Sequence, residues 1–388
     1  MLNAPYLPFN LPEIGEEEIT AVVETMRSGW LTTGARTATF ESDFQRYTGA
    51  RHALALNSCT AALHLALEAL GVGPGDEVIT TPLTFCSTVH AIVHTGASPV
   101  LADVDETGNV DPASVAERIT PRTKALLPVH LAGLPCRMDE LWELARRHKL
   151  FVVEDAAHAV GTYYGGQHLG ADGASESDAV AYSFYATKNL TTGEGGMVTT
   201  NQPELFARMK ALALHGLNRD AWNRYGEKGS WFYQVLEAGF KYNLSDLQSA
   251  IGVEQLKKIE RFTERRRALA ERYQRAFAAV AEVECPPEAV GGRHAWHLYI
   301  LRLRRERLQI GRDEFLAELR DRGIGISVHF IPVPLHPVYA GLGDAYPCPR
   351  AIGLYERMFS LPLYPSMTEG QVDRVIAAVQ DIADRWRR

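Results

Sequence analysis

Two residues of opposite charge, Lys188 and Asp155, come shortly after apolar runs with the length and β-propensity of buried strands. The runs are 179–184 and 150–153. A lysine amine can form a Schiff base, and a carboxylate can keep a pyridine nitrogen protonated so that the ring accepts electrons. Taken singly, the two residues are better explained as a surface lysine and a helix-capping aspartate. Together they indicate a pyridoxal phosphate site at one edge of a sheet.

The elements that must position these residues alternate along the chain from about residue 58 to residue 200. Helical patterns cover 60–70, 86–95 and 138–148, and strand patterns cover 77–80, 100–104, 125–129 and 150–153. This alternation predicts an α/β fold with a mostly parallel sheet between two layers of helices. Ligands of such sheets bind outside the carboxyl ends of the strands, where Asp155 and Lys188 are expected.

A second, smaller unit is predicted after residue 250. Helix-forming residues dominate 246–278, which predicts one long helix leading into this unit. A strand at 297–303, a helix at 312–322, a strand at 326–330 and a last helix at 369–386 predict an α+β domain. We therefore expect a large domain at 1–250 and a small C-terminal domain at 251–388. The arginines at 261 and 265–267 lie among glutamates, which predicts a solvated helix face.

Composition excludes several classes of protein. The 388 residues leave room for two domains, and 46% hydrophobic with 22% charged residues is typical of globular chains. A net charge of −7 provides no basic field for nucleic acid. The five cysteines are an odd number at irregular spacing, so neither a disulfide framework nor a metal site is expected. No signal peptide or apolar run of about 18 residues is evident, so we expect no membrane partner and a cytoplasmic location.

Five segments, in this order along the chain, resemble the motifs of DegT/StrS-type sugar-nucleotide aminotransferases. They are GWLTTG at 29–34, NSCTAAL at 57–63, EDAAHAVG at 154–161, SFYATKNLTTGEGG at 183–196 and GFKYNLSD at 239–246. The resemblance implies a fold-type I pyridoxal phosphate enzyme whose large domain has a seven-stranded sheet. A narrower likeness, at 155–164, 215–217, 241–244 and 294–298, is to the enzymes that make UDP-4-amino-4-deoxy-L-arabinose.

The same resemblance implies a role for individual residues. Cofactor contacts are expected from Ser58, Cys59, Thr60, Phe85, Asp155, His158, Ser183, Lys188, Lys241 and Asn243. Substrate contacts are expected from Trp30, Thr32 and His329. Phosphate would bind the amides at 59 and 60, which begin a helix, and Phe85 would stack on the pyridine ring. Open alternatives are an N-cap role for Ser58 or Thr60, a core position for Phe85 and a packing role for His329.

The loop at 239–246 resembles one that reaches the cofactor phosphate of a neighbouring subunit. We expect either Lys241 or Asn243 to make this contact, and hence a homodimer with shared active sites.

The reaction implied is the transfer of an amino group from L-glutamate, which leaves 2-oxoglutarate, to the 4-keto group of a nucleotide sugar. UDP-4-keto-pentose is the first candidate, in lipid A modification of lipopolysaccharide and polymyxin resistance. The alternative is a nucleotide-linked keto-hexose, aminated at C3 or C4, in the synthesis of O-antigen or antibiotic sugars. The segment 217–229 is expected to set this choice.

Three other functions compete with this interpretation. A related sugar dehydratase carries histidine where this chain has Lys188. A non-catalytic regulatory protein of the same fold would be expected to lose Asp155, Lys188 or Thr60, and all three are present. A nicotinamide oxidoreductase would need a G-x-G-x-x-G turn that opens a helix, which the sequence lacks.

Overall fold

The larger part of the chain is organised by a seven-stranded sheet in the order β1-β9-β8-β5-β4-β2-β3. The computed structural model describes residues 5–217, 233–289 and 291–388. The strands are β1 (His52–Leu56), β2 (Glu77–Thr80), β3 (Ser98–Leu101), β4 (Thr123–Leu127), β5 (Phe151–Asp155), β8 (Ala179–Ser183) and β9 (Gly196–Thr200). Four neighbouring pairs are parallel, and the two pairs that β9 makes are antiparallel. The predicted seven-stranded, mostly parallel sheet is confirmed.

Helices cover both faces of this sheet because successive strand residues point to opposite sides. In β8, Ala179 and Ala181 pack with α3 (Cys59–Ala69), whereas Val180 and Tyr182 pack with α2 (Ala35–Thr48). The other helices of this part are α1 (Glu16–Ser28), α4 (Cys86–His94), α5 (Pro112–Arg118), α6 (Met138–His148) and α7 (Pro203–Leu212). Buried residues of α4 and α7 pack in the same cluster as α3, on the same face of the sheet. The helical pattern thus gives the three-layer arrangement expected from the sequence.

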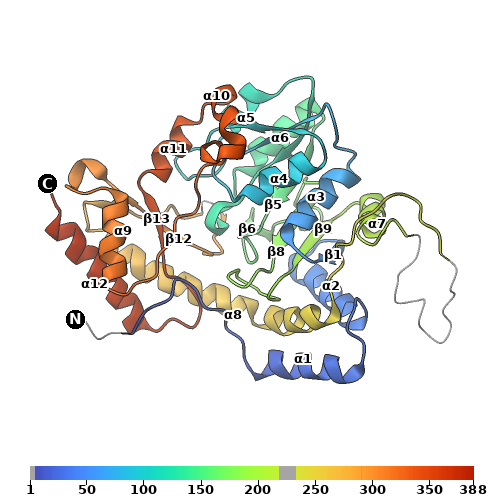
Figure 1. Cartoon of the computed structure of the whole chain (residues 1–388), viewed down its shortest axis with the longest axis horizontal. Coiled ribbons are helices and arrows are strands. Elements are labelled where there is room, and N and C mark those ends of the chain that lie inside the picture. The colour runs from blue at the N-terminus through green and yellow to red at the C-terminus, as the bar shows by residue number, and fades with distance from the viewer. Residues whose placement is uncertain (1–4, 218–232, 290) are drawn as a thin grey trace.

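A single long helix, α8 (Asp246–Phe277), runs from the large sheet into the C-terminal part (Figure 1). It begins at a capping box between Ser245 and Gln248. The C-terminal part has an antiparallel sheet of β10 (Val283–Glu284), β12 (Tyr299–Leu303) and β13 (Met358–Leu361). Its helices are α9 (Arg312–Asp321), α10 (Ala340–Ala345), α11 (Pro349–Tyr355) and α12 (Glu369–Arg385). A second small sheet combines β6 (Tyr163–Tyr164), β7 (Gln167–His168) and β11 (Gly292–Arg293). The domain border predicted at 250/251 falls inside α8 and stays a prediction.

The strand predicted at 326–330 is wrong. Only Ser327 pairs there, through one isolated bridge to Ser360 of β13. The third place in the small sheet belongs to β13, and residues 329 and 330 turn instead toward the cavity described below. Ile326 and Val328 pack against the C-terminal core without strand pairing, and such apolar residues give the same local pattern as those of a buried strand.

The solvated arginine face predicted on α8 is right in part. Arg261 pairs with Glu13, and Arg267 pairs with Glu264, at exposed positions. Arg266 is buried and donates instead to the carbonyls of His297 and Leu363. It ties α8 to the C-terminal part, where burial lowers its pKa to about 10.

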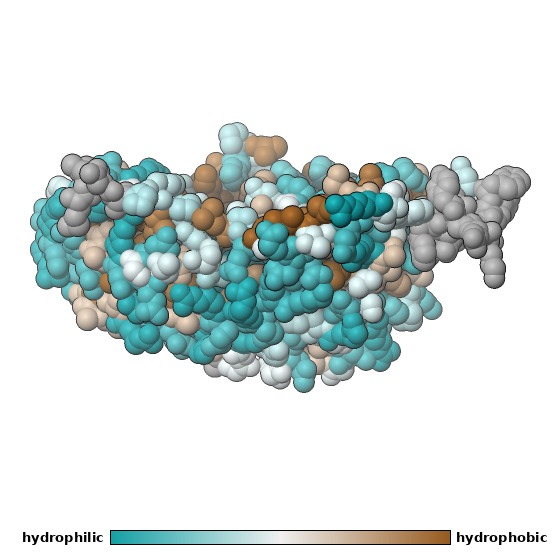
Figure 2. Space-filling view, turned by 90° about the horizontal axis from the view of Figure 1, so that it is seen from below, coloured by the Kyte–Doolittle hydropathy of each residue, from teal (hydrophilic) through white to brown (hydrophobic). Residues whose placement is uncertain are grey.

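The surface seen from below is largely hydrophilic, with hydrophobic colour confined to small patches (Figure 2). Over the described ranges, none of the helices combines the length and the apolar character that a bilayer crossing requires.

Candidate active site

A cavity of about 550 Å³ opens at the carboxyl ends of β5 and β8. This volume is in the range of small-molecule sites. The walls contain nine of the predicted site residues, namely Ser58, Cys59, Thr60, Phe85, Asp155, His158, Ser183, Lys188 and His329. The two residues from which the sequence reasoning began therefore share one cavity.

Asp155, the last residue of β5, is 3% exposed and is held in a fixed orientation. Its Oδ2 accepts a hydrogen bond from the hydroxyl of Thr88 (2.8 Å), and its Oδ1 accepts one from the amide of Ala157 (3.1 Å). Burial raises the pKa of Asp155, and the bonds from Thr88 and Ala157 and the charge of Lys188 oppose that rise. A cationic partner stabilises the charged form of a buried carboxylate, and a protonated pyridine nitrogen would be such a partner.

Lys188 lies in the turn after β8, where its amide bonds the carbonyl of Tyr185. Burial lowers its pKa to about 8, although Cys59 and Asp155 act in the opposite direction. The loop is fixed from a distant part of the chain, because the Asn10 side chain donates to the carbonyl of Thr187 (3.1 Å). A lysine in this environment is a better nucleophile near neutral pH than one in water.

We expect the reactivity of Lys188 in the cofactor-free protein to rise with pH and level off above about 8. Only the neutral amine reacts, and a lysine in water titrates near about 10.4. Reductive methylation with formaldehyde, followed by peptide mass spectrometry at several pH values, measures this for each lysine. Solvent-exposed lysines are the internal control. A Lys188 rate that still rises steeply at pH 10 would contradict the lowered pKa.

The start of α3 has the features of an anion site. The Ser58 hydroxyl caps the helix by accepting from the amide of Ala61 (3.1 Å). The amides of Cys59 and Thr60, at the first two helical positions, have no intrahelical acceptor, and both residues line the cavity. Gly196 of β9 passes so close that a Cβ there would lie 2.6 Å from the Cys59 nitrogen. Only glycine fits at position 196. The two amides at the start of α3 are suited to binding a phosphate group.

The N-cap alternative for Ser58 is therefore confirmed for its side chain, and a cofactor contact from Ser58 stays a prediction. Cys59 is buried, which raises the pKa of its thiol well above the usual value and disfavours a thiolate.

Phe85 is not a core residue, because 59% of its surface is exposed. It lines the cavity. Its ring is 6.0 Å from that of Phe330, on the same wall. An exposed aromatic face inside a cavity offers a stacking surface to a flat ligand ring.

Three histidines form another wall of the cavity, His158, His297 and His329. Burial and the positive charge of Lys188 lower the pKa of all three, to about 4 for His329 and well below the usual value for His158 and His297. These rings are neutral at physiological pH. His329 also stacks on Phe9 (5.4 Å) and bonds Ser360, so it has a packing contact as well as a place in the cavity.

Four predicted residues lie outside this cavity, namely Trp30, Thr32, Lys241 and Asn243. They lie near the start of α8: Asn243 donates to the Thr33 hydroxyl (2.7 Å), and Trp30 donates to the Thr33 carbonyl (3.2 Å). The side chains of Lys241 and Asn243 contact each other. A single chain does not bring this group to the Lys188 cavity.

Sequence reasoning missed several residues of the cavity wall, among them Phe9, Asn10, Ser87, His297 and Phe330. His297 belongs to the segment 294–298, which the narrower resemblance had marked without assigning a role. Phe9 and Asn10 reach the site from the N-terminal segment, which carries no local pattern for this role.

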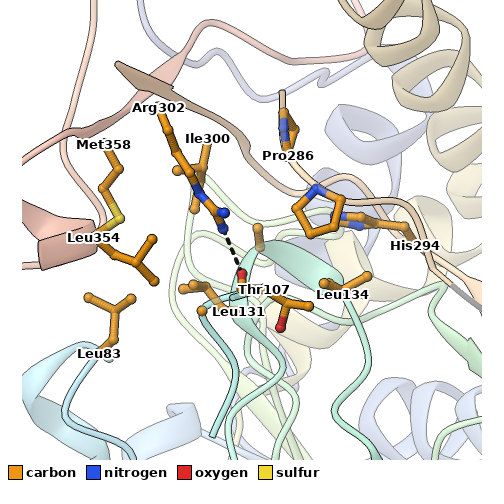
Figure 3. A pocket seen from close by; sticks show the side chains of 13 residues that line it. Leu83, Thr107, Leu131, Leu134, Pro286, His294, Ile300, Arg302, Leu354 and Met358 are labelled. Atoms are coloured by element: carbon orange, nitrogen blue, oxygen red, sulfur yellow. Dashed lines mark hydrogen bonds between the residues drawn. The ribbon is translucent and has the colours of Figure 1, made fainter. Parts of the chain in front are cut away.

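A much smaller cavity, of about 20 Å³, lies between β12, β13 and the segment around Thr107 (Figure 3). Arg302 points into it and donates to the Thr107 carbonyl (2.9 Å). Its volume is enough for about one water molecule and too small for a substrate.

Comparison with known proteins agrees with this geometry. The model of the DegT/DnrJ/EryC1/StrS aminotransferase family matches residues 12–380. The spore coat polysaccharide biosynthesis protein SpsC of Bacillus subtilis is 52% identical over 382 residues, 97% of each chain. A proposed sugar aminotransferase of Streptococcus pneumoniae, Spr1654, solved in PMP and PLP forms, superposes with a TM-score of 0.90 at 33% identity over 98% of this chain and 99% of that chain. DesV of S. venezuelae superposes with a TM-score of 0.89 at 37% identity over 98% of this chain and 100% of that chain.

Proposed function

Because the chain belongs to the DegT/DnrJ/EryC1/StrS aminotransferase family, whose fold-type I transaminases use pyridoxal 5′-phosphate, we propose that it transfers an amino group from L-glutamate to the 4-keto group of a nucleotide-linked sugar. The observation that carries the proposal is the shared cavity, in which Lys188, Asp155 and the start of α3 meet.

The residues present fit the cofactor. The amides of Cys59 and Thr60 would hold its phosphate, Phe85 and His158 would border its ring, and Asp155 would pair with its pyridine nitrogen. The bound cofactor supplies an electron sink for breaking bonds at the donor carbon.

Lys188 has two functions in this proposal. Its amine holds the cofactor covalently in the resting protein, and once displaced it takes and returns the proton at its own Nζ. A pKa of about 8 suits both, since the amine can give and accept a proton near neutral pH. The carboxylate of Asp155 would stabilise the positive charge of the protonated pyridine nitrogen during the whole reaction.

For the sugar, the first candidate is UDP-4-keto-pentose, whose amination product is UDP-4-amino-4-deoxy-L-arabinose, used in lipid A modification and polymyxin resistance. The support is the narrower resemblance, which includes the segment 294–298, now at the cavity wall through His297. The second candidate is a keto-hexose for a surface polysaccharide, favoured by the 52% identity to SpsC. The segment 217–229, expected to choose between them, lies almost wholly outside the described residues.

A panel of substrates separates the candidates. Purified protein with pyridoxal phosphate and L-glutamate is supplied with UDP-4-keto-pentose, with 4-keto-6-deoxyhexoses and with 3-keto-6-deoxyhexoses on UDP and dTDP. Amino-sugar product is measured by mass spectrometry. The first candidate requires kcat/KM for the pentose at least about 100-fold above the hexoses, a discrimination within the range that one extra carbon causes in a close-fitting pocket. Preference for a hexose would support the second candidate, and no product from any sugar would contradict the substrate class.

We also propose a cytoplasmic homodimer in which the Lys241–Asn243 loop serves the partner's site. The four residues outside the cavity of one chain support this proposal, since they have no place at its Lys188. Lys188→Ala and a Lys241→Ala/Asn243→Ala double variant should each be inactive and should recover activity when mixed. A hybrid dimer would hold one intact site, so recovery should approach half of the wild-type activity per hybrid. An active monomer in sedimentation, or no recovery despite confirmed subunit exchange, would contradict the shared site.

A further inference from the structure

The three cavity histidines are all fixed to the protein through the same ring nitrogen. Nδ1 of His158 bonds the Ala132 amide (3.2 Å), Nδ1 of His297 bonds the Asn189 side chain (3.0 Å), and Nδ1 of His329 bonds Ser360 (2.8 Å). No group in the described part of the chain is bonded to Nε2 of any of these rings. The Nε2 atoms are therefore the ring nitrogens available to Lys188 or to a ligand.

His158 presents a donor. A backbone amide can only donate, so Nδ1 of His158 must accept from Ala132 and carries no proton. A neutral imidazole then has its proton on Nε2.

His297 presents an acceptor, for a reason that lies in Asn189. The Asn189 side-chain nitrogen donates to the carbonyls of Val160 (3.3 Å) and Ala295 (3.0 Å). Two carbonyl oxygens facing the same atom fix the orientation of the amide, because an amide oxygen there would meet two acceptors. Oδ1 of Asn189 is thus turned to His297 and can only accept. The proton of His297 is on Nδ1, and Nε2 keeps its lone pair.

His297 and Lys188 line the same cavity. Burial is the main cause of the low pKa of His297, and the neighbouring His158 and the charge of Lys188 add to it. Asn189, which fixes the tautomer, is the next residue after Lys188, which carries the amine. Arg266 holds the His297 backbone through its carbonyl (3.3 Å). His297 is thus held through its backbone carbonyl and its Nδ1, and it lines the same cavity as Lys188, whose amine has N–H bonds to donate.

We propose that His297 is a positioning residue for Lys188: its Nε2 accepts a hydrogen bond from the Lys188 amine when that amine is not covalently bound, and Asn189 enforces the ring tautomer that makes this bond possible. This inference rests on the proposed function, in which the free amine must be aimed to move a proton. The other tautomer would turn an N–H toward the N–H bonds of an ammonium, or would occupy the lone pair with which a neutral amine takes the proton, and a protonated ring would repel the ammonium.

The tautomers can be measured without any turnover. In the cofactor-free protein, long-range ¹⁵N–¹H correlation spectra of the imidazoles should show His297 protonated on Nδ1 and His158 protonated on Nε2. Asn189→Ala should populate the Nε2-protonated form of His297 and leave His158 unchanged. Nε2 protonation of His297 in the wild type, or an unchanged ring in the Asn189→Ala variant, would overturn the role of Asn189.

Two substitutions at 297 separate positioning from packing. His297→Asn places an amide at the position of Nδ1, so it keeps a donor for Asn189 and loses the acceptor in the cavity. His297→Gln places its amide oxygen at the position of Nε2, so it keeps an acceptor and loses the bond to Asn189. We expect kcat to fall by roughly 10- to 100-fold in His297→Asn, with KM for glutamate within about threefold, and to fall less in His297→Gln. The thermal unfolding midpoints of the two variants, and their cofactor affinities measured by fluorescence, should not rank in the same order as their kcat values.

Equal activity in the two variants, or an activity order that matches their unfolding midpoints, would overturn the positioning role. If the wild type itself takes no amino group from glutamate, the proposed function fails while the tautomer spectra are still interpretable. If the wild type is active and His297→Asn matches it, only the inference fails.

Discussion

Replacing Lys188 by alanine is expected to abolish amino-group transfer, with a loss of at least about 10⁴-fold, because the covalent anchor and the proton carrier are the same atom. The substitution removes a side chain at a cavity wall and not in the packed core, so the fold should persist. Single-turnover kinetics with glutamate, read from 2-oxoglutarate release by the pyridoxal phosphate-loaded protein, measures the loss.

Lys257→Ala is the matched control, since Lys257 is an exposed lysine of α8 paired with Glu254 (2.7 Å). That variant should keep wild-type activity. Transfer by Lys188→Ala at more than a trace, with contamination by host enzyme excluded, would mean that another group does the work assigned to Lys188.

Asp155→Asn is expected to slow the half-reaction with glutamate by on the order of 10²- to 10³-fold, the size of effect seen when one preorganised electrostatic group is removed from an active site. An asparagine can keep both observed contacts, because its oxygen can accept from the Ala157 amide and its nitrogen can donate to the Thr88 hydroxyl. Cofactor binding and folding should therefore survive. Stopped-flow absorbance after mixing with glutamate gives the rate, and fluorescence gives the cofactor affinity.

Thr88→Val provides the graded comparison. It removes one hydrogen bond to the Asp155 carboxylate and leaves the charge, so the half-reaction should slow by only about tenfold or less. A near-normal rate in Asp155→Asn would reduce Asp155 to the local capping role that its bond to Ala157 also fits.

Local chemistry allowed much of this site to be predicted. Strand runs ending in Asp155 and before Lys188, and a serine three residues before Ala61, are patterns within a few residues, and the structure has all three where they were expected. The sheet between two layers of helices follows from the same short-range periodicity.

Other parts of the site could not be predicted because they depend on contacts between distant segments. The Asn10 side chain bonds Thr187, which is 177 positions away, and no local pattern encodes that approach. The run 326–330 has a strand's composition, but only Ser327 pairs with a neighbouring strand, and only the last two residues line the cavity. Arg266 has the sequence context of a surface residue but is buried under the C-terminal part. The burial of a residue and its hydrogen-bond partners depend on the complete fold, so these features could not be predicted from short sequence patterns.

The most direct measurement for the central claim locates the cofactor on the chain. The protein is loaded with pyridoxal phosphate, reduced with borohydride with or without prior L-glutamate, digested and examined by mass spectrometry. We predict one labelled peptide, containing Lys188, at about one label per chain, and loss of that label after glutamate because the amino group has moved from the donor to the cofactor and freed the lysine. A label on a different lysine, or a label on Lys188 that glutamate does not remove, would contradict the account.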